Sequence, residues 1–296
     1  MLGDQQGARR HIEDMLAGYV PPATSSHIIR YQNEQMIAAL RVLAPVLWLQ
    51  GYPDRAMRMV EDAVGNALEV DHVLSLCNLL AQAACPLAFL TGDLDAARRF
   101  TAILVEHAAL HSLEMWSAYG RCFEGRLMTR EGRLNNGLSR MRGAGADMRR
   151  AGFLQYYTPY LGSLAEALGA DGQIVPGLAA IGEAIERAES TDEHWCLAEL
   201  LRIKAELLLM QGAPGAAATA EDHFRQALDW ARRQGALSWQ LRAATSLAHL
   251  LRDRDRIGEA RDLLAPIYER FTEGFGTADL QAGKKLLDKL NSPHRQ

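Results

Sequence analysis

The sequence has few aromatic rings and few of the residue runs that build sheets. Aromatic residues make up 7% of the 296 residues, and long runs of Val, Ile and Thr are scarce, whereas Ala and Leu are abundant. Strands favour β-branched and aromatic residues, while helices favour Ala and Leu. The scarcity of strand-forming runs therefore predicts an all-α protein.

The sequence also has no apolar signal core at its start and no uninterrupted run of about 18 apolar residues. We therefore expect neither an export signal nor a membrane span. The net charge is −4, and no basic tail or extended Lys/Arg block is present. A polyanion such as DNA attracts basic surfaces, so this composition argues against direct nucleic-acid binding.

The four cysteines lie scattered in apolar stretches, and none forms a C-x2-C pair: Cys77, Cys85, Cys122 and Cys196. Disulfides persist in oxidising compartments, and zinc sites use closely spaced cysteines. The pattern therefore predicts buried free thiols in a reducing compartment, which we take to be the cytoplasm.

Motifs for catalysis are missing. Neither a G-x4-G-K-[ST] loop for triphosphates nor a G-x-S-x-G nucleophile elbow is present. His107 and His111 are four residues apart and share a helix face, as two metal ligands require, but Ala108 replaces the Glu of H-E-x-x-H and no third ligand is indicated. Cys77 and Cys85, with His72 nearby, are a weaker metal candidate. We predict no catalytic, cofactor-binding or metal-ligating residue; a helical metal-dependent enzyme that uses His107 and His111 is the remote alternative.

What the sequence does contain is a repeat of roughly 40 residues. Seven small residues recur with gaps of 48, 40, 41, 40, 43 and 40 residues: Ala8, Ala56, Ala96, Gly137, Gly177, Ala220 and Ala260. A second set precedes members of the first by 12 to 15 residues: Ala44, Ala84, Gly125, Ala165, Ala205 and Ala248. Small residues at facing positions let helix A and helix B of a hairpin cross closely, as in tetratricopeptide repeats, whose unit is about 34 residues.

The turns and ends divide the chain. Glycines that suit a left-handed helix end follow the A helices: Gly51, Gly92, Gly132, Gly172 and Gly212. We expect a half repeat with helix B only at 1–19, a linker at 20–32, the solenoid at 33–270, a capping helix at 277–290 and a polar tail at 291–296. Because a solenoid needs capped ends, the half repeat suggests that a part is missing at the N-terminus. Pro45 and Pro86 fall inside predicted A helices, where each removes one backbone bond.

In tetratricopeptide-type solenoids the A helices line the concave groove. The positions three before, one after and four after each A-helix anchor are expected to face the groove, and Tyr119, Glu199 and Arg242 lie one turn further back on the same side. From these positions we select ten candidate partner-binding residues: Arg41, Trp48, Tyr119, Arg126, Glu166, Glu199, Arg202, Glu206, Arg242 and His249. Two interpretations stay open at this point. The charged residues, Glu199, Arg202 and Glu206 among them, either form salt bridges within and between A helices or face a ligand. Trp48 and Trp195 either belong to the core or serve as ligand platforms.

Several segments resemble one bacterial family: LWLQGYPDRA, SLCNLLAQAACPLAFLTGDLDAA, EHWCLAELLRIKAELLLMQG, AEDHFRQALDWARRQGALSWQLRAATSLAHLLRD and ERFTEGFGTADLQAGKKLLDKL. The family is the C-terminal tetratricopeptide-like arm of multidomain signalling proteins with a STAND-type ATPase and a winged-helix or adenylate/guanylate cyclase output domain. The resemblance covers nearly the whole chain, and it implies an arm that senses a partner or restrains the ATPase. Ala205 departs from it, since Gly is expected there. No ATP-binding, cyclase or DNA-reading residue carries over.

We therefore predict an all-α, right-handed solenoid of about six and a half tetratricopeptide-like hairpins with a C-terminal capping helix. Its concave groove is expected to bind a protein or peptide, with an ATPase or output domain of the same parent protein as one such partner, and it needs no cofactor. A homo-oligomer is compatible with this prediction. The alternative is a free-standing adaptor or oligomerisation scaffold.

Overall fold

The computed structural model describes residues 3–19, 35–70, 72–152 and 154–292. The predicted linker at 20–32 lies outside these residues, and so does most of the predicted polar tail. Within the described residues the secondary structure is helical, without strands. The chain divides into an N-terminal unit of Gln5–Trp48 and Pro53–Tyr156, and a C-terminal unit of Tyr157–Gln296 with the short segments Met1–Asp4 and Leu49–Tyr52. We describe each unit by itself.

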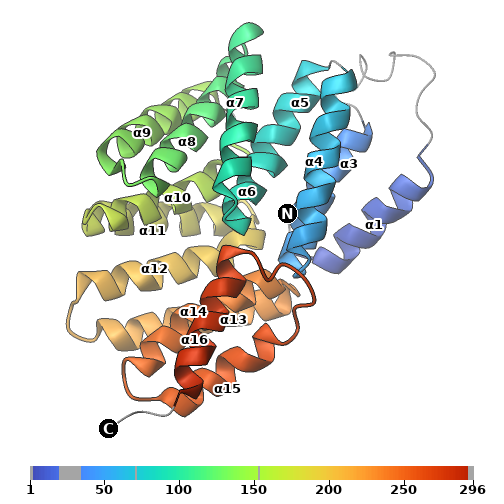
Figure 1. The fold of residues 1–296 in the computed structure, drawn as a ribbon. Coiled ribbons are helices and arrows are strands. Elements are labelled where there is room, and N and C mark those ends of the chain that lie inside the picture. Colours follow the sequence, from blue (N-terminus) through green and yellow to red (C-terminus); the bar gives the residue numbers. More distant parts are fainter. Residues whose placement is uncertain (1–2, 20–34, 71, 153, 293–296) are drawn as a thin grey trace. The chain divides into compact units, whose positions relative to one another are not determined.

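The N-terminal unit holds α1 and three helical hairpins (Figure 1). Its helices are α1 (Gln5–Ala17), α3 (Gln35–Leu49), α4 (Pro53–Val70), α5 (Val73–Leu79), α6 (Cys85–Thr91), α7 (Leu94–Leu110), α8 (Glu114–Arg130) and α9 (Leu134–Ala151). The A helices are α3, the α5–α6 segment and α8, and the B helices are α4, α7 and α9.

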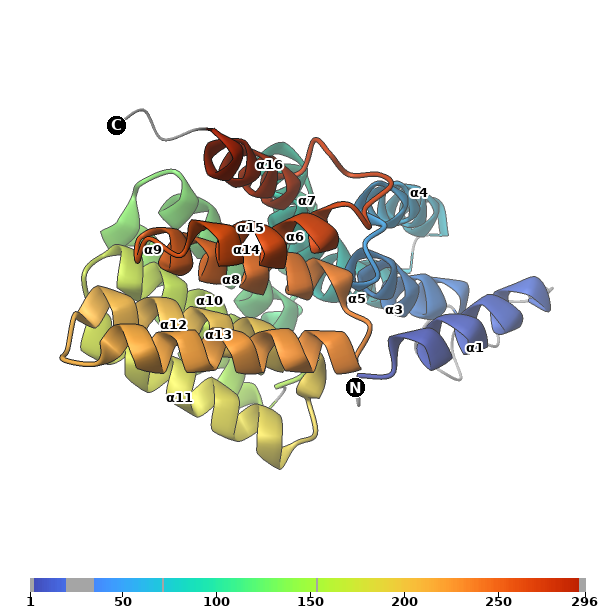
Figure 2. The ribbon, with the colours of Figure 1, turned by 90° about the horizontal axis from the view of Figure 1, so that it is seen from below.

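The C-terminal unit holds three further hairpins and a last helix. Its helices are α10 (Tyr157–Ala170), α11 (Ile174–Ser190), α12 (Leu197–Gln211), α13 (Ala216–Arg233), α14 (Leu237–Arg252), α15 (Ile257–Tyr268) and α16 (Ala278–Asn291), with a 3₁₀ turn at His194–Cys196 before α12. The A helices are α10, α12 and α14. Helices α12 and α13 lie side by side as one hairpin (Figure 2).

The small residues that set the repeat lie at the helix crossings. The alanine anchors from Ala44 onward are all fully buried. In the α8–α9 hairpin, a Cβ atom added to Gly137 would lie 2.6 Å from the backbone oxygen of Gly125, and one added to Gly125 would lie 2.8 Å from the backbone oxygen of Gly137. These backbones therefore touch where the two glycines meet. The first anchor differs, because Ala8 and Ile12 on α1 are partly exposed.

The turns between A and B helices use the predicted glycines. Gly51, Gly92, Gly132, Gly172 and Gly212 all have positive φ angles, between 67° and 92°. This conformation ends the A helix and turns the chain without the steric penalty that a Cβ atom brings. Asp93 caps the next helix, since its carboxylate accepts a hydrogen bond of 2.8 Å from the backbone N–H of Ala96. The turn before α15 has Asp255 in the left-handed region instead, with a φ of 60°.

The A helix at 73–91 is continuous but changes its hydrogen-bond register. Residues Leu80–Ala84 form one turn of π-helix, in which the N–H of Cys85 donates to the carbonyl oxygen of Leu80 five residues earlier. Pro86 follows immediately and has no N–H to donate, so the regular ladder is interrupted at this point. Pro45 lies within α3.

The same stretch, Val73–Thr91, is the one helix in the described part of the chain that is long and apolar enough to cross a membrane by length and composition. Most of it is buried inside the protein. The core helix of a packed helical unit passes the same test, and the burial of residues such as Leu79, Leu80 and Leu87 identifies it as a core helix.

The crossing of α8 and α9 yields a paired prediction. Gly137→Ala should destabilise the protein by about 1–3 kcal/mol, because the new methyl group has no room. Gly143→Ala on the same helix should stabilise it by about 0.5–1 kcal/mol, since nothing lies within 4 Å of a Cβ there and Ala is the better helix former. Urea unfolding of both variants measures the difference, and two changes of the same sign would contradict the assignment of the crossing.

Candidate partner-binding face

The candidate site in the C-terminal unit is the face formed by a row of four helices. Helix α12 packs between α10 and α14, and α16 packs against α14 on the other side. Helix α16 thus continues the row of A helices. Charged side chains from all four helices meet on this face, which we call the A-helix face.

Arg202 on α12 is the centre of the network on this face. Its Nε lies 2.7 Å from Glu199 Oε2, its Nη1 2.6 Å from Glu206 Oε1 and its Nη2 3.0 Å from Glu166 Oε1. Glu199 and Glu206 belong to the same helix, and Glu166 comes from α10. The guanidinium group therefore joins two neighbouring A helices.

Arg242 on α14 extends the network in the other direction. Its Nη1 donates to Glu199 Oε1 over 2.8 Å, and its Nε donates to Asp279 Oδ2 on α16 over 2.7 Å. The hydroxyl group of Ser246, also on α14, donates to Glu206 Oε1 over 2.8 Å. A continuous chain of charge-assisted bonds, the ionic ladder, thus crosses α10, α12, α14 and α16.

The ladder has a buried inner part and a partly exposed outer part. The side chains of Arg202 and Glu199 are only 9% and 11% exposed. Those of Glu166 and Glu206 are 29% and 35% exposed, and His249 on α14 is exposed. The salt-bridge interpretation therefore holds for Glu199, Arg202 and Glu206. Glu166 and Arg242 also form salt bridges. Glu166 and Glu206 are in addition partly exposed, and His249 is exposed.

Burial and charge act in opposite directions on the acids of the ladder. Burial raises the pKa of Glu199, but the positive charges of Arg202 and Arg242 outweigh it and lower this pKa from 4.5 to about 2. For Asp279, burial outweighs the attraction of Arg242, and its pKa is raised. Burial also disfavours the charged form of Arg242, yet its two acidic neighbours raise its pKa overall.

The candidates of the N-terminal unit are mostly interior. Trp48 is 2% exposed and Tyr119 is 0% exposed, so neither presents a surface to a partner. The hydroxyl oxygen of Tyr119 accepts a hydrogen bond of 3.1 Å from the backbone N–H of Tyr156, and the two rings pack 6.2 Å apart. The groove assignment of these two residues is corrected to the core, because the positions counted also face the neighbouring helix.

The two candidate arginines of the N-terminal unit, Arg41 and Arg126, have surroundings that differ from those of Arg202. The guanidinium carbon of Arg126, a residue 8% exposed, lies 4.3 Å from the ring centre of Phe89, a cation–π arrangement. Arg41 donates to Gln82, whose amide also donates to Asn78 and Gln155. Burial lowers the pKa of Arg41.

Trp195, in the C-terminal unit, is half-buried, and its carbonyl oxygen accepts a hydrogen bond of 3.0 Å from the indole N–H of Trp239.

The histidines and cysteines considered for metal binding take part in ring stacking, helix capping and core packing. The rings of His107 and His111 are stacked, with centres 6.5 Å apart. His72 caps α5, since its Nδ1 accepts the backbone N–H of Ser75 over 3.3 Å. All four cysteines are free and buried, and burial raises the pKa of Cys77, Cys85 and Cys122 to about 12. No group of three or more His, Cys, Asp or Glu within the described residues is placed to hold a metal ion.

Sequence reasoning missed two members of the ladder, Ser246 and Asp279. Asp279 lies 37 residues after Arg242, close to one repeat. Extending the 40-residue spacing into the last helix would have found it. The capping helix was instead treated only as a cover for the end of the stack.

Comparisons with known proteins bear on the fold. No protein-family model matches the chain. An uncharacterized protein of Rhizobium meliloti (strain 1021) is 27% identical over 218 residues, which are 74% of this chain and 21% of that protein. The chain thus spans about a fifth of the length of this relative.

Among solved structures, the yeast Tom70 is similar with a TM-score of 0.50 and 16% identity, over 96% of this chain and 59% of Tom70. A circular tandem repeat protein with novel repeat topology matches at 15% identity over 97% of this chain and 75% of its own, but its TM-score of 0.20 is too low to support an argument. With the hairpins described above, the likeness to Tom70 shows an all-α solenoid of tetratricopeptide-like repeats.

Removing Arg202 from the ladder should lower the stability of the protein more than removing Arg225, an exposed arginine that also bridges neighbouring helices. Arg202→Met should destabilise the protein by about 3–5 kcal/mol, because it leaves the buried Glu199 without its closest counter-charge. Arg225→Met on α13 breaks an equally short pair with Glu221, but the Arg225 side chain is 48% exposed, and the loss should be at most about 1 kcal/mol. Urea unfolding at neutral pH measures both, and equal losses would contradict the buried role of Arg202.

The lowered pKa of Glu199 also predicts an acid-dependent loss of stability. A carboxylate with a depressed pKa stabilises the folded state above its unfolded pKa, and this contribution is lost as the pH falls through the folded value. The stability difference between wild type and Glu199→Gln should therefore be largest above pH 4.5 and shrink towards pH 2. Unfolding free energies measured across this range test it; a difference independent of pH would contradict the assigned shift.

Proposed function

We propose that the chain is a non-catalytic, protein- or peptide-binding arm whose partner lies along the A-helix face. The observation that carries this proposal is the ionic ladder. Its inner members, Arg202 and Glu199, are fixed by several bonds each, while Glu166, Glu206 and His249 present polar atoms to solvent next to them.

Stability alone gives little reason for such a ladder. Replacing a buried ion pair by well-packed apolar residues is often neutral or stabilising, because both charges lose their hydration on burial. Binding gives a better reason, since charged groups held in place before a partner arrives lose less freedom when it binds. The fully bonded, partly exposed acids of α10 and α12 fit a pre-organised binding face.

We further propose that the arm serves as the sensor or regulatory part of a larger bacterial signalling protein in the cytoplasm. Support comes from its resemblance to arms that follow a STAND-type ATPase and a winged-helix or cyclase output domain. The match to one fifth of a Rhizobium meliloti protein also fits a module within a longer chain. The ATPase or output domain of the same parent is then one partner for the A-helix face.

Photo-crosslinking tests the binding face. A photoreactive residue placed at His249 in the intact protein, expressed in the cells that encode it, should cross-link to another polypeptide or to another domain of the parent. The matched control is Glu186, an exposed residue on the B helix α11. Cross-links of equal yield from both positions would contradict a partner on the A-helix face.

The same samples test the parent protein. A tag at the C-terminus reports the mass of the natural product before irradiation. A product several times larger than this chain supports an arm of a multidomain protein. A product at the mass of this chain alone contradicts the arm and favours the free-standing adaptor, whatever the cross-links show.

A further inference from the structure

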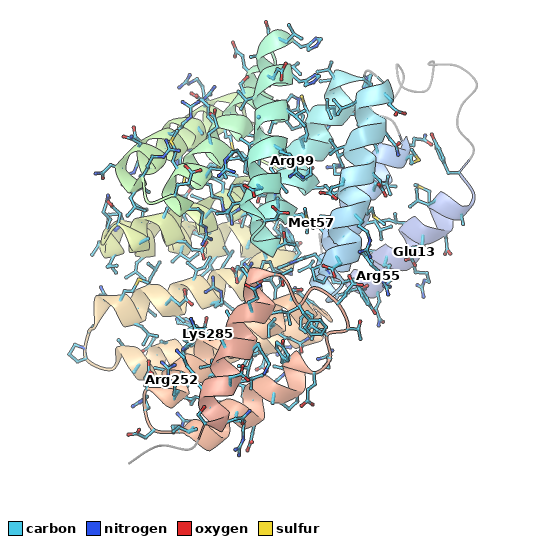
Figure 3. The ribbon with its side chains drawn as sticks, in the orientation of Figure 1. Glu13, Arg55, Met57, Arg99, Arg252 and Lys285 are labelled. Carbon is cyan, nitrogen blue, oxygen red and sulfur yellow. The ribbon has the colours of Figure 1, made fainter. Side chains whose placement is uncertain are left out.

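The lysines of the chain are concentrated on its last helix. The sequence has four lysines, and three of them, Lys284, Lys285 and Lys289, lie on α16, with Lys204 on α12 as the fourth. Elsewhere the positive charges of the chain are arginines. Figure 3 labels one lysine of α16, Lys285, and one arginine, Arg252, which is the last residue of the neighbouring helix α14.

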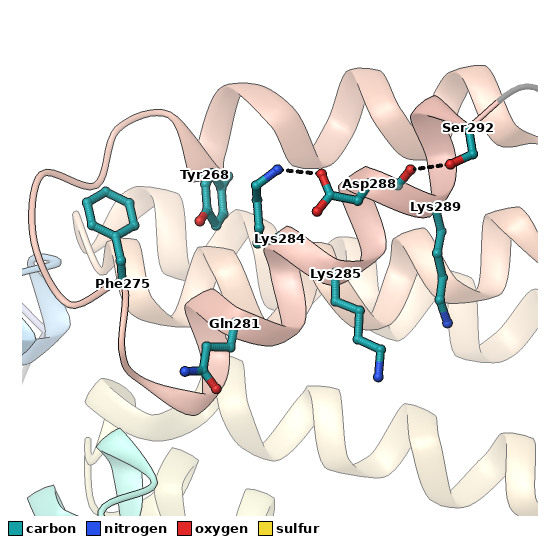
Figure 4. Close-up of a pocket in the computed structure, with 8 residues that line it drawn as sticks. All are labelled: Tyr268, Phe275, Gln281, Lys284, Lys285, Asp288, Lys289 and Ser292. Atoms are coloured by element: carbon teal, nitrogen blue, oxygen red, sulfur yellow. Dashed lines mark hydrogen bonds and ion pairs between the residues drawn. The ribbon is translucent and has the colours of Figure 1, made fainter.

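These lysines line an open hollow of about 570 Å³ on the outer face of α16. Leu280, Gly283, Leu286, Leu287 and Leu290 form the buried face of the helix, which leaves the lysines on the solvent side. Gln281, Asp288 and Ser292 share that side, and Tyr268 and Phe275 stand beside it (Figure 4). All of these residues belong to the C-terminal unit.

The charges in the hollow are unbalanced. The ammonium group of Lys284 forms an ion pair with Asp288. Lys285 and Lys289 have no ion-pair partner within the described residues, and their i, i+4 spacing places them one turn apart on the same helix face. The charge of Lys289 also acts on His249 of α14, where it adds to burial and Arg252 in lowering the pKa of the imidazole. Two unmatched ammonium groups therefore face solvent together.

The aromatic pair gives the hollow an apolar flank. The rings of Tyr268 and Phe275 lie 6.2 Å apart at 51°. Phe275 is 52% exposed, and it is the one aromatic ring among the exposed large apolar side chains of the described residues. Exposed aromatic rings beside a charged rim are typical of protein-binding sites, where they supply most of the contact energy.

We propose that the outer face of α16 docks an acidic peptide segment with two carboxylates for Lys285 and Lys289 and one large apolar side chain for Tyr268 and Phe275. Ammonium groups attract carboxylates as point charges, and they do not impose the paired-bond geometry of a guanidinium fork. No arginine lines the hollow. A peptide ligand also accounts for the aromatic flank, which a purely ionic ligand would leave uncovered.

This surface adjoins the A-helix face on α16 but is made of other side chains, and it goes beyond the function proposed for that face. The ionic ladder contains four carboxylates and two guanidinium groups, and the outer face of α16 contains three ammonium groups and one carboxylate. The ladder and the lining of the hollow thus carry net charges of opposite sign. They are expected to select segments of opposite charge.

Selection from a displayed library of random peptides on the full chain tests the proposal. The enriched peptides should be rich in Asp and Glu and contain a large apolar residue. The most enriched peptide, made with a fluorescent label, should bind about tenfold more weakly to the variant with Lys285→Gln and Lys289→Gln. Phe275→Ser should weaken binding as well. Lys204→Gln, the matched control on α12, should leave affinity unchanged, and rising salt should weaken binding to the wild type.

Several outcomes would overturn the proposal. They are a library without binders, enriched peptides without acidic residues, and equal affinity of the double lysine variant. Binding of phosphatidylserine vesicles or duplex DNA that depends on Lys285 and Lys289, without peptide binding, would assign the face to a different ligand. A peptide that no longer binds the variant with Glu166→Gln and Glu206→Gln, but still binds the double lysine variant, is a ligand of the A-helix face. The two surfaces are therefore tested independently. Circular dichroism confirms that each variant folds.

Discussion

Close contact between the backbones of paired helices is the constraint on which the rest of the structure depends. At the crossing of α8 and α9, no room exists for even a methyl group on Gly125 or Gly137. Small residues recur about every 40 positions on the A helices of the C-terminal unit as well, at Ala165, Ala205 and Ala248. Within this unit α12 packs between α10 and α14, and the same side of each is presented to its neighbour. Arg242 can reach both Glu199 and Asp279 for this reason, since its helix lies between theirs with a matching rotation.

The ionic ladder adds directional bonds to a stack that is otherwise held by apolar contacts. Apolar packing tolerates small rotations of a helix about its axis, whereas charge-assisted bonds are short and depend on angle. Arg202 bonds to acids on α10 and on its own helix α12, and Arg242 on α14 bonds to acids on α12 and α16. Each of these helices is therefore fixed in rotation as well as in distance. Burial raises the pKa of both Glu199 and Asp279, but Glu199 is bonded to two arginines, whereas Asp279 is bonded to one and also feels the negative charge of Glu199, so their pKa values shift in opposite directions.

Much of the fold could be predicted from the sequence because its determinants are local and periodic. The glycine at each turn and the glycine pair at the α8–α9 crossing needed only spacing and residue size. The candidate face was harder. Trp48 and Tyr119 occupy positions that count as groove-facing, yet tertiary packing buries both. Arg202 and Glu206 were recognised as charged neighbours, but which carboxylate each guanidinium group meets depends on side-chain rotamers. The π-helical turn before Pro86 was also beyond prediction, since a proline in a helix can kink it, end it or shift its register.

The uneven use of lysine and arginine has a chemical consequence. Primary amines react with acylating reagents at neutral to mildly alkaline pH, whereas guanidinium groups do not. Apart from the terminal amine, the chain offers such reagents four lysine side chains, and three of these lie on α16. Acylation would remove positive charge from one helix face and leave the arginine-based ladder intact. A protein coupled to a solid support through its amines would be held mainly by this face.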